Sequence, residues 1–293
     1  MLRCWMRVRK RSQPELKRFA RSFRALILCC VPCLAGCASA LLNSERLGVD
    51  AEFEQHLLTG DRFKHLIYSR RGQIPSQVLH VYLSGDGSPW IGRTRISSDP
   101  TPRNPVALRL MSMDPNPSLY LGRPCYHGLA HTAGCDASRW TYGRYSEQVV
   151  ASLTKALQGF VHEHGYREIV LIGYSGGGVL AWLMAERLGR LRLLVTIAAN
   201  LDIDAWTNLH GYTPLHDSLN PANRPPLPTH IRQLHVVGTR DTNVPPSLTV
   251  ATLTGTQKQI LVMAKPVDHR CCWERLWPDL LHDIQRLGMR PLD

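Results

Sequence analysis

A serine flanked by glycines is the residue of this chain best suited to act as a nucleophile. Ser175 lies in the sequence Gly-Tyr-Ser-Gly-Gly, which spans residues 173–177. A Gly-x-Ser-x-Gly turn reverses the chain so sharply that a Cβ at Gly173 or Gly177 would clash. The same turn lifts the serine hydroxyl above the edge of a sheet, where a base can reach it. The spacing therefore predicts a nucleophile elbow at Ser175.

A base and an acid that could activate this serine follow later in the chain. A serine hydroxyl is unreactive at neutral pH unless a base removes its proton during the attack. We assign this role to His269, which follows a predicted strand at residues 259–263. Asp241, which follows a predicted strand at 234–237, would hold the imidazole in the required tautomer. Competing candidates for the two roles are His210, His235, Asp202 and Asp268.

The elements that must position these residues alternate between strands and helices. Residues 168–172 form an apolar, β-branched run before the serine turn, and apolar residues recur at helical spacing after it until Gly189. Further strands are predicted at 63–68, 77–83, 118–121 and 193–198, and helices at 106–113, at 149–161 and from Pro278 onward. This alternation predicts a mostly parallel sheet covered by helices on both faces, the α/β class. Residues 200–229, rich in Pro, Asn and His, interrupt the alternation and are predicted to form a small cap over the site.

The chain order of the three candidates, Ser then Asp then His, is that of the α/β-hydrolases. The turn Gly-x-x-Asp-x-x-Val-Pro at residues 238–245 also resembles the turn that carries the acid in that family. The chain resembles an α/β-hydrolase over nearly all of residues 61–293, and in particular bacterial α/β-hydrolase-type lipoproteins of poorly defined substrate. The resemblance implies a serine hydrolase that acts on a small ester or acyl substrate and needs no cofactor or metal.

The tetrahedral intermediate of such a reaction needs hydrogen-bond donors for its oxyanion. We predict the N–H of Gly176 as one donor and the N–H of Asp86 or Gly87 as the other. These two residues belong to the sequence Ser-Gly-Asp-Gly at 84–87, where Ser84 occupies the position of the histidine commoner in the family. Asp86 is equally well explained as a turn residue with no catalytic role.

The N-terminus has the pattern of an export signal. Residues 1–24 carry nine Lys or Arg and one acidic residue, and an apolar run follows at 25–33. That run is too short to span a bilayer, which takes about 20 apolar residues. The sequence Leu-Ala-Gly-Cys at 34–37 resembles the lipobox of bacterial lipoproteins, which implies a signal peptide at 1–36, acylation of Cys37 and a tether at 37–60. Ala38 implies sorting to the outer membrane, with the protein lipid-anchored in the cell envelope and facing the periplasm.

Charge gives no indication of a nucleic-acid partner. The signal segment supplies a net +8 of the formal +12, so the remaining chain carries only +4. We therefore expect the membrane, through the lipid anchor, and a small-molecule substrate as partners, and no nucleic acid.

Four cysteines lie beyond the predicted lipidation site, an even number that suits an oxidising compartment. We predict a Cys125–Cys135 disulfide. The competing hypothesis is a zinc site formed by these two cysteines with His127 and His131, since zinc accepts such a set of thiolates and imidazoles. The neighbouring cysteines at 271 and 272 would form a vicinal bridge or pair with the first two.

Two classes of function are compatible with these residues. The first is a lipid-anchored serine hydrolase that cleaves carboxylic esters, with thioesterase or peptidase activity as variants of the same chemistry. The second is a non-catalytic envelope lipoprotein that uses the fold as an interaction scaffold, because a fold does not determine a function. The complete set of Ser175, Asp241 and His269 favours the enzyme.

Overall fold

The computed structural model describes residues 53–92, 94–253 and 260–289. The predicted signal segment at 1–36 and the predicted lipidation site, Cys37, lie outside the described residues. No helix in the described part of the chain is long and apolar enough to cross a membrane.

An eight-stranded sheet forms the centre of the domain, in the order β1-β2-β6-β3-β7-β8-β9-β10. The strand bounds are β1 Glu54–Thr59, β2 Lys64–Arg70, β3 Val78–Leu83, β6 Ser118–Leu121, β7 Glu168–Tyr174, β8 Leu191–Ile197, β9 Arg232–Gly238 and β10 Ile260–Lys265. Strands β6, β3, β7, β8, β9 and β10 run parallel, and β1 and β2 are antiparallel to their neighbours. The predicted α/β class and the mostly parallel sheet are confirmed.

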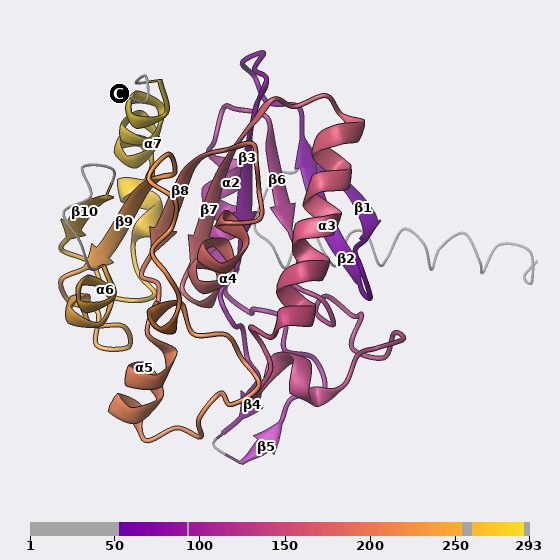
Figure 1. Ribbon diagram of the computed structural model, residues 1–293, viewed down its shortest axis with the longest axis vertical. Coiled ribbons are helices and arrows are strands. Elements are labelled where there is room, and N and C mark those ends of the chain that lie inside the picture. Colours follow the sequence, from indigo (N-terminus) through magenta and orange to yellow (C-terminus); the bar gives the residue numbers. More distant parts are fainter. Residues whose placement is uncertain (1–52, 93, 254–259, 290–293) are drawn as a thin grey trace, which may run out of the picture. The chain divides into compact units, whose positions relative to one another are not determined.

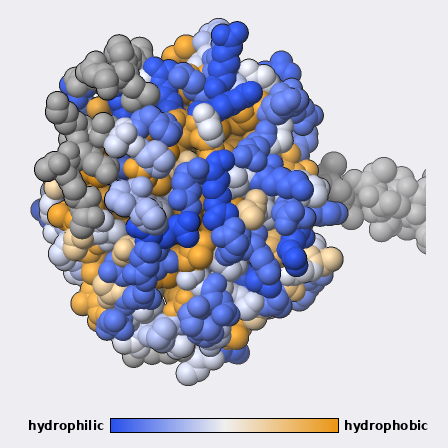
Figure 2. Space-filling model, in the orientation of Figure 1, coloured by the Kyte–Doolittle hydropathy of each residue, from blue (hydrophilic) through white to orange (hydrophobic). Residues whose placement is uncertain are grey.

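Helices cover both faces of this sheet, which is why its central strands are apolar on both sides. Helices α3 (Glu147–Glu163) and α4 (Gly176–Ala185) contact each other and lie in front of the sheet in Figure 1. Helices α2 (Val106–Ser112) and α7 (Trp273–Met289) contact each other on the opposite face. The apolar stripe of α3 is buried as its helical spacing predicts, while Figure 2 shows mainly hydrophilic residues on the surface over this helix.

The remaining elements lie in the connections. They are the two-stranded ribbon β4 Trp90–Ile91 and β5 Arg95–Ile96, the helices α5 Ile203–His210 and α6 Pro246–Thr252, and the short 3₁₀ turns η1 Ala137–Trp140 and η2 Pro221–Asn223. Residues 200–229, the segment predicted as a cap, contain α5 and η2. Trp206 Nε1 of α5 donates a hydrogen bond of 3.0 Å to the carbonyl of Asn243, so α5 supports the loop after β9.

Two predicted element bounds differ from the structure. The predicted tether extends to residue 60, yet Glu54–Thr59 form β1 at the edge of the sheet. Most of β1 is exposed, so the strand depends on backbone pairing with β2, and no apolar pattern in the sequence marks it.

The last helix begins at Trp273 rather than at Pro278, which lies inside α7. Proline usually stands at the first position of a helix because it lacks the N–H that an interior residue donates. Here Trp273 and Trp277 are both completely buried, and the Trp277 ring contacts Tyr82 edge-on at 6.0 Å between centroids. Burial of these two indoles stabilises the extra helical turn against the missing hydrogen bond.

Candidate active site

Ser175 occupies the sharp turn between β7 and α4. Its backbone has φ 52° and ψ −126°, a region that non-glycine residues rarely adopt. A Cβ at Gly173 would lie 2.3 Å from the carbonyl oxygen of Gly177, and one at Gly177 would lie 2.3 Å from that of Leu83. The expectation that only glycine fits at these two positions is confirmed.

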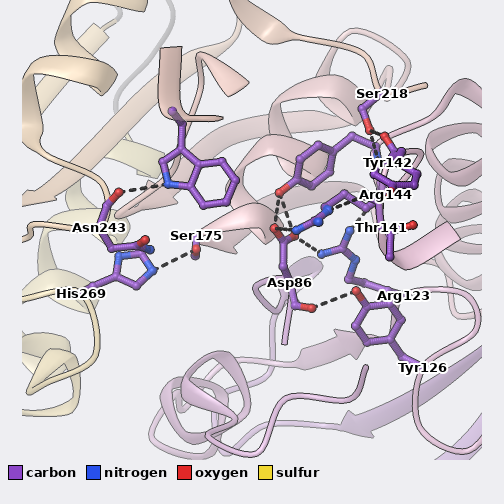
Figure 3. Close-up of polar contacts among 12 residues, drawn as sticks. Asp86, Arg123, Tyr126, Thr141, Tyr142, Arg144, Ser175, Ser218, Asn243 and His269 are labelled. Atoms are coloured by element: carbon purple, nitrogen blue, oxygen red, sulfur yellow. Dashed lines mark hydrogen bonds and ion pairs between the residues drawn. The ribbon is translucent and has the colours of Figure 1, made fainter. Parts of the chain in front are cut away.

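His269 and Asp241 meet Ser175 at the carboxyl ends of the strands. His269 Nε2 lies 3.1 Å from Ser175 Oγ, and His269 Nδ1 lies 2.7 Å from Asp241 Oδ2. Because an ionised carboxylate only accepts hydrogen bonds, Nδ1 is the protonated nitrogen and Nε2 is free to accept the serine proton. The structure therefore brings the three predicted residues into one hydrogen-bonded chain, and Figure 3 shows His269 pointing at Ser175.

Both partners of the serine are themselves held in place. The N–H groups of Asn243 and Val244 donate to Asp241 Oδ1 at 2.9 and 2.8 Å, so the second carboxylate oxygen faces His269. The carbonyl of His269 accepts hydrogen bonds from the Tyr174 hydroxyl and from Trp273 Nε1. Ring and backbone of His269 are thus fixed separately.

The competing candidates have other contacts. Asp202 caps α5 by accepting from the N–H of Ala205, and Asp268 accepts from the N–H groups of the next loop residues. His235 is buried against Thr196, and His210 Nε2 lies 2.7 Å from the carbonyl oxygen of Asn243. None of these four contacts Ser175 or His269 through a side-chain hydrogen bond within the described residues.

The segment predicted to complete the oxyanion hole lies beside the serine turn. A Cβ at Gly85 would lie 3.2 Å from Ser175 Cβ, so the loop after β3 runs directly past Ser175. Gly176 is the first residue of α4, and the first N–H groups of a helix have no partner within it. The Ser84 hydroxyl accepts a hydrogen bond of 2.9 Å from the Tyr120 hydroxyl.

A charged cluster around Asp86 was not predicted from the sequence. Arg123 and Arg144 donate to its two carboxylate oxygens, and the Tyr145 hydroxyl lies 2.7 Å from both. Burial opposes ionisation of Asp86, but the two guanidinium groups outweigh it and lower its pKa to about 2. The available signal was that Arg123 follows the carboxyl end of the predicted strand at 118–121, the same sheet edge as Asp86.

A second serine–histidine pair lies inside the protein. His65 Nε2 is 2.8 Å from Ser152 Oγ, but His65 Nδ1 faces the carbonyl of Gly122 instead of a carboxylate. Burial lowers the pKa of His65 to about 4, and the side chain is fully buried. Without an acid partner or access to a substrate, this pair has a structural role.

Cys125 and Cys135 form a disulfide with their Cα atoms 5.5 Å apart, within the reach of such a bond. The two sulfur atoms that the alternative zinc site would use as thiolates are therefore bonded to each other. Among the described residues, no group of three or more His, Cys, Asp or Glu could hold a metal ion. Cys271 and Cys272 are joined to each other, so the two pairs do not cross.

Comparisons with known proteins give matches at the level of structure. No protein-family model matches the sequence, and no curated protein matches it significantly. A lidless α/β serine hydrolase from Xanthomonas campestris is 16% identical with a TM-score of 0.52, and the match covers 81% of this chain and 94% of the other. An esterase from Pyrococcus furiosus is 11% identical with a TM-score of 0.58, covering 84% and 91%.

A third similar structure is a membrane phospholipase A described as a bacterial virulence factor. It is 15% identical with a TM-score of 0.53, and the match covers 92% of this chain and 97% of the other. These likenesses extend over most of each chain and agree with the mostly parallel sheet described above. The chain therefore has the α/β-hydrolase fold.

Proposed function

We propose that the protein is a serine hydrolase that cleaves carboxylic esters through an acyl-serine intermediate. The observation that carries the proposal is the continuous chain of hydrogen bonds from Ser175 through His269 to Asp241. The strained backbone at Ser175 adds support, because such conformations persist where the surrounding structure enforces them and are common at active sites.

The geometry suits a two-step reaction. Ser175 Oγ attacks the ester carbonyl while its proton passes to His269 Nε2, and Asp241 stabilises the imidazolium that forms. The carbonyl oxygen becomes an oxyanion held by the N–H of Gly176 and a second N–H from Asp86 or Gly87. The intermediate collapses as the alcohol leaves with the proton from His269. A water molecule then attacks the acyl-serine by the same route and releases the acid.

Esters are the preferred substrate class because two of the similar structures are described as an esterase and a phospholipase A. Thioesters and amides can be cleaved by the same residues, and relative rates on matched acyl substrates distinguish these three classes. A non-catalytic scaffold is the outcome if no substrate of any class is turned over.

The test uses the purified protein, p-nitrophenyl butyrate and a fluorophosphonate probe, which labels only an activated serine. We expect the wild type to be labelled and Ser175→Ala to lose both labelling and at least about 10³-fold of kcat. The matched control is Ser152→Ala, which removes the serine of the buried pair and should keep labelling at Ser175. Full activity in Ser175→Ala would refute the assignment, and an unlabelled, inactive wild type would favour the scaffold.

We also propose that the protein is anchored by lipid on Cys37 in the cell envelope, which the Leu-Ala-Gly-Cys sequence supports. Mass spectrometry of the native protein should find an acylated N-terminal cysteine, and Cys37→Ser should release the protein from the membrane fraction. An intact, unmodified N-terminus on the native protein would contradict the anchor without affecting the proposed catalysis.

A further inference from the structure

The Asp86 cluster, formed by Asp86, Arg123, Arg144, Tyr126 and Tyr145, lies next to the serine turn (Figure 3). The Arg123 and Arg144 side chains are only 1% and 7% exposed, and that of Asp86 is 15% exposed. Arg144 Nη1 lies 2.9 Å from Asp86 Oδ2, and Arg123 Nη1 donates to Oδ1. The guanidinium groups are therefore committed to Asp86 and are too deeply buried to bind a substrate.

Burying the charges of this cluster is unfavourable in free energy. Two guanidinium groups and one carboxylate leave a net charge of +1 inside the protein, and removing charges from water costs several kcal/mol per ion. Replacement of a buried ion cluster by apolar residues often leaves protein stability unchanged or raises it. A contribution to stability therefore does not by itself explain why the Asp86 cluster is present. A role for the geometry that the cluster imposes is the better explanation.

The cluster contacts both segments that would supply oxyanion donors. A Cβ at Gly176 would lie 2.0 Å from Asp86 Oδ1 and 2.4 Å from the Tyr145 hydroxyl, so both groups pack directly against the Gly176 α-carbon. Asp86 itself belongs to the loop that passes Ser175. The Tyr126 hydroxyl donates a hydrogen bond of 2.9 Å to the main-chain carbonyl of Asp86. Asp86 is thus held at its side chain and at its backbone.

The residues that hold Asp86 are held in turn. Arg123 Nη2 donates to the carbonyl of Arg144 at 2.8 Å, and Arg144 Nε donates to the carbonyl of Thr141 at 2.7 Å. Burial raises the pKa of Tyr145, so its hydroxyl remains protonated and donates to the carboxylate. The main-chain N–H of Tyr145 also donates to Ser218 Oγ at 3.1 Å, so Arg123, Arg144 and Tyr145 are each restrained by a further hydrogen bond.

We propose that Asp86 is a positioning residue for the oxyanion hole: its clamped carboxylate and carbonyl hold the loop after β3 against Gly176, so that both main-chain donors face the oxyanion. This inference rests on the proposed serine-hydrolase function and extends it. It assigns a task to the side chains of Asp86, Arg123, Arg144, Tyr126 and Tyr145, none of which touches the substrate. The donors act on charge that develops in the transition state, so loosening the clamp lowers kcat and leaves KM nearly unchanged.

The test uses tyrosine-to-phenylalanine variants, since Phe keeps the ring that stacks on Arg123 and removes only the hydroxyl. We expect Tyr126→Phe and Tyr145→Phe each to lower kcat on p-nitrophenyl butyrate by about 10- to 100-fold, with KM changed by less than about threefold. Binding of an alkyl trifluoromethyl ketone, whose serine adduct carries an oxyanion, should weaken by the same factor as kcat falls.

The matched control is Tyr82→Phe. Tyr82 is a completely buried tyrosine that also donates to a carboxylate, Asp114, but belongs to no part of the proposed site. It should lower the melting temperature by an amount similar to the other two variants and change kcat less than about threefold. Asp86→Asn, which leaves two unbalanced guanidinium groups, is a further variant with the same expected kcat effect where it folds.

The outcomes separate the two proposals. A wild type that neither hydrolyses esters nor reacts with the fluorophosphonate overturns the proposed function and this inference with it. An active wild type whose Tyr126→Phe and Tyr145→Phe variants keep its kcat and ketone affinity overturns the inference alone. A loss confined to thermal stability would assign the cluster a purely structural role, and a rise in KM with kcat unchanged would assign it to substrate binding; either result would also overturn the inference.

Discussion

His269 shows how the proposed catalytic geometry is assembled from separate contacts. Its Nδ1 faces Asp241, its Nε2 faces Ser175, and its carbonyl accepts from Tyr174 and Trp273. Asp241 is itself oriented by two backbone N–H groups, so the carboxylate sets the ring before any substrate binds. In the proposed mechanism, this preorganisation allows proton transfer without rearrangement of the protein.

The residue-scale prediction concerns the tautomer of this ring. Asp241→Asn should keep the fold and lower kcat by roughly 10³- to 10⁴-fold, since an amide N–H facing Nδ1 favours the tautomer with the proton on Nε2. KM should change little. Asp202→Asn is the control, because asparagine also caps helices and Asp202 lies outside the hydrogen-bonded chain. Equal activity of Asp241→Asn and wild type in steady-state kinetics would exclude Asp241 as the orienting acid.

At the scale of elements, the site is built where loops leave the same edge of the sheet. The loop after β3 carries Asp86, the loop after β6 carries Arg123 and Tyr126, and the turn after β7 carries Ser175. The Cys125–Cys135 disulfide closes part of the β6 loop directly beside Tyr126. It therefore restrains a segment that supplies two members of the Asp86 cluster.

The element-scale prediction is that this disulfide stabilises the folded protein measurably. Its sequence separation of 10 corresponds to about 2.5–3 kcal/mol in the chain-entropy model. The double variant Cys125→Ser with Cys135→Ser should lose that amount in urea denaturation. Cys271→Ser with Cys272→Ser is the control, because a bridge between adjacent residues closes almost no loop and its loss should cost far less. Equal losses for the two pairs would contradict the entropic explanation.

At the scale of the whole molecule, buried histidines link folding to pH. His65 and His235 are completely buried, and burial lowers the pKa of each to about 4 from 6.5. Burial lowers the pKa of His127 to about 4 as well. The folded protein therefore binds fewer protons than the unfolded chain between these values. The contribution of these histidines to the free energy of unfolding is fully present above about pH 6.5 and is lost progressively as the pH falls toward 4.

The corresponding prediction is a decline in the free energy of unfolding between pH 6.5 and 5, a range in which ordinary carboxyl groups stay mostly ionised. Urea denaturation of Ser175→Ala at several pH values measures it, and His235→Gln in that background should reduce the slope by roughly a third. The control is His56→Gln, at an exposed position on β1, which should leave the slope unchanged. A slope that His235→Gln does not alter would place the pH sensitivity elsewhere.

Local sequence was sufficient to predict much of the sheet and the sharp turn at Ser175. Apolar β-branched runs and helical spacing located β7, α3 and α4, and the glycines around Ser175 indicated its turn. These features follow from sterics and burial within a few residues, so they can be predicted without a tertiary structure. The start of α7 was missed because burial of Trp273 and Trp277 prevails over the preference of Pro278 for the first helical position.

Long-range packing decided the rest of the site. The order of Ser175, Asp241 and His269 along the chain narrowed the choice of partners. Only the folded sheet, in which β7, β8, β9 and β10 follow one another, brought these three side chains together and left Asp202 and Asp268 aside. The partners of Asp86 lie 37 to 59 residues away along the chain, on loops whose meeting depends on strand order. A sequence determines turns and strands through short-range sterics, whereas contacts between loops exist only after the sheet has set which strand ends are neighbours.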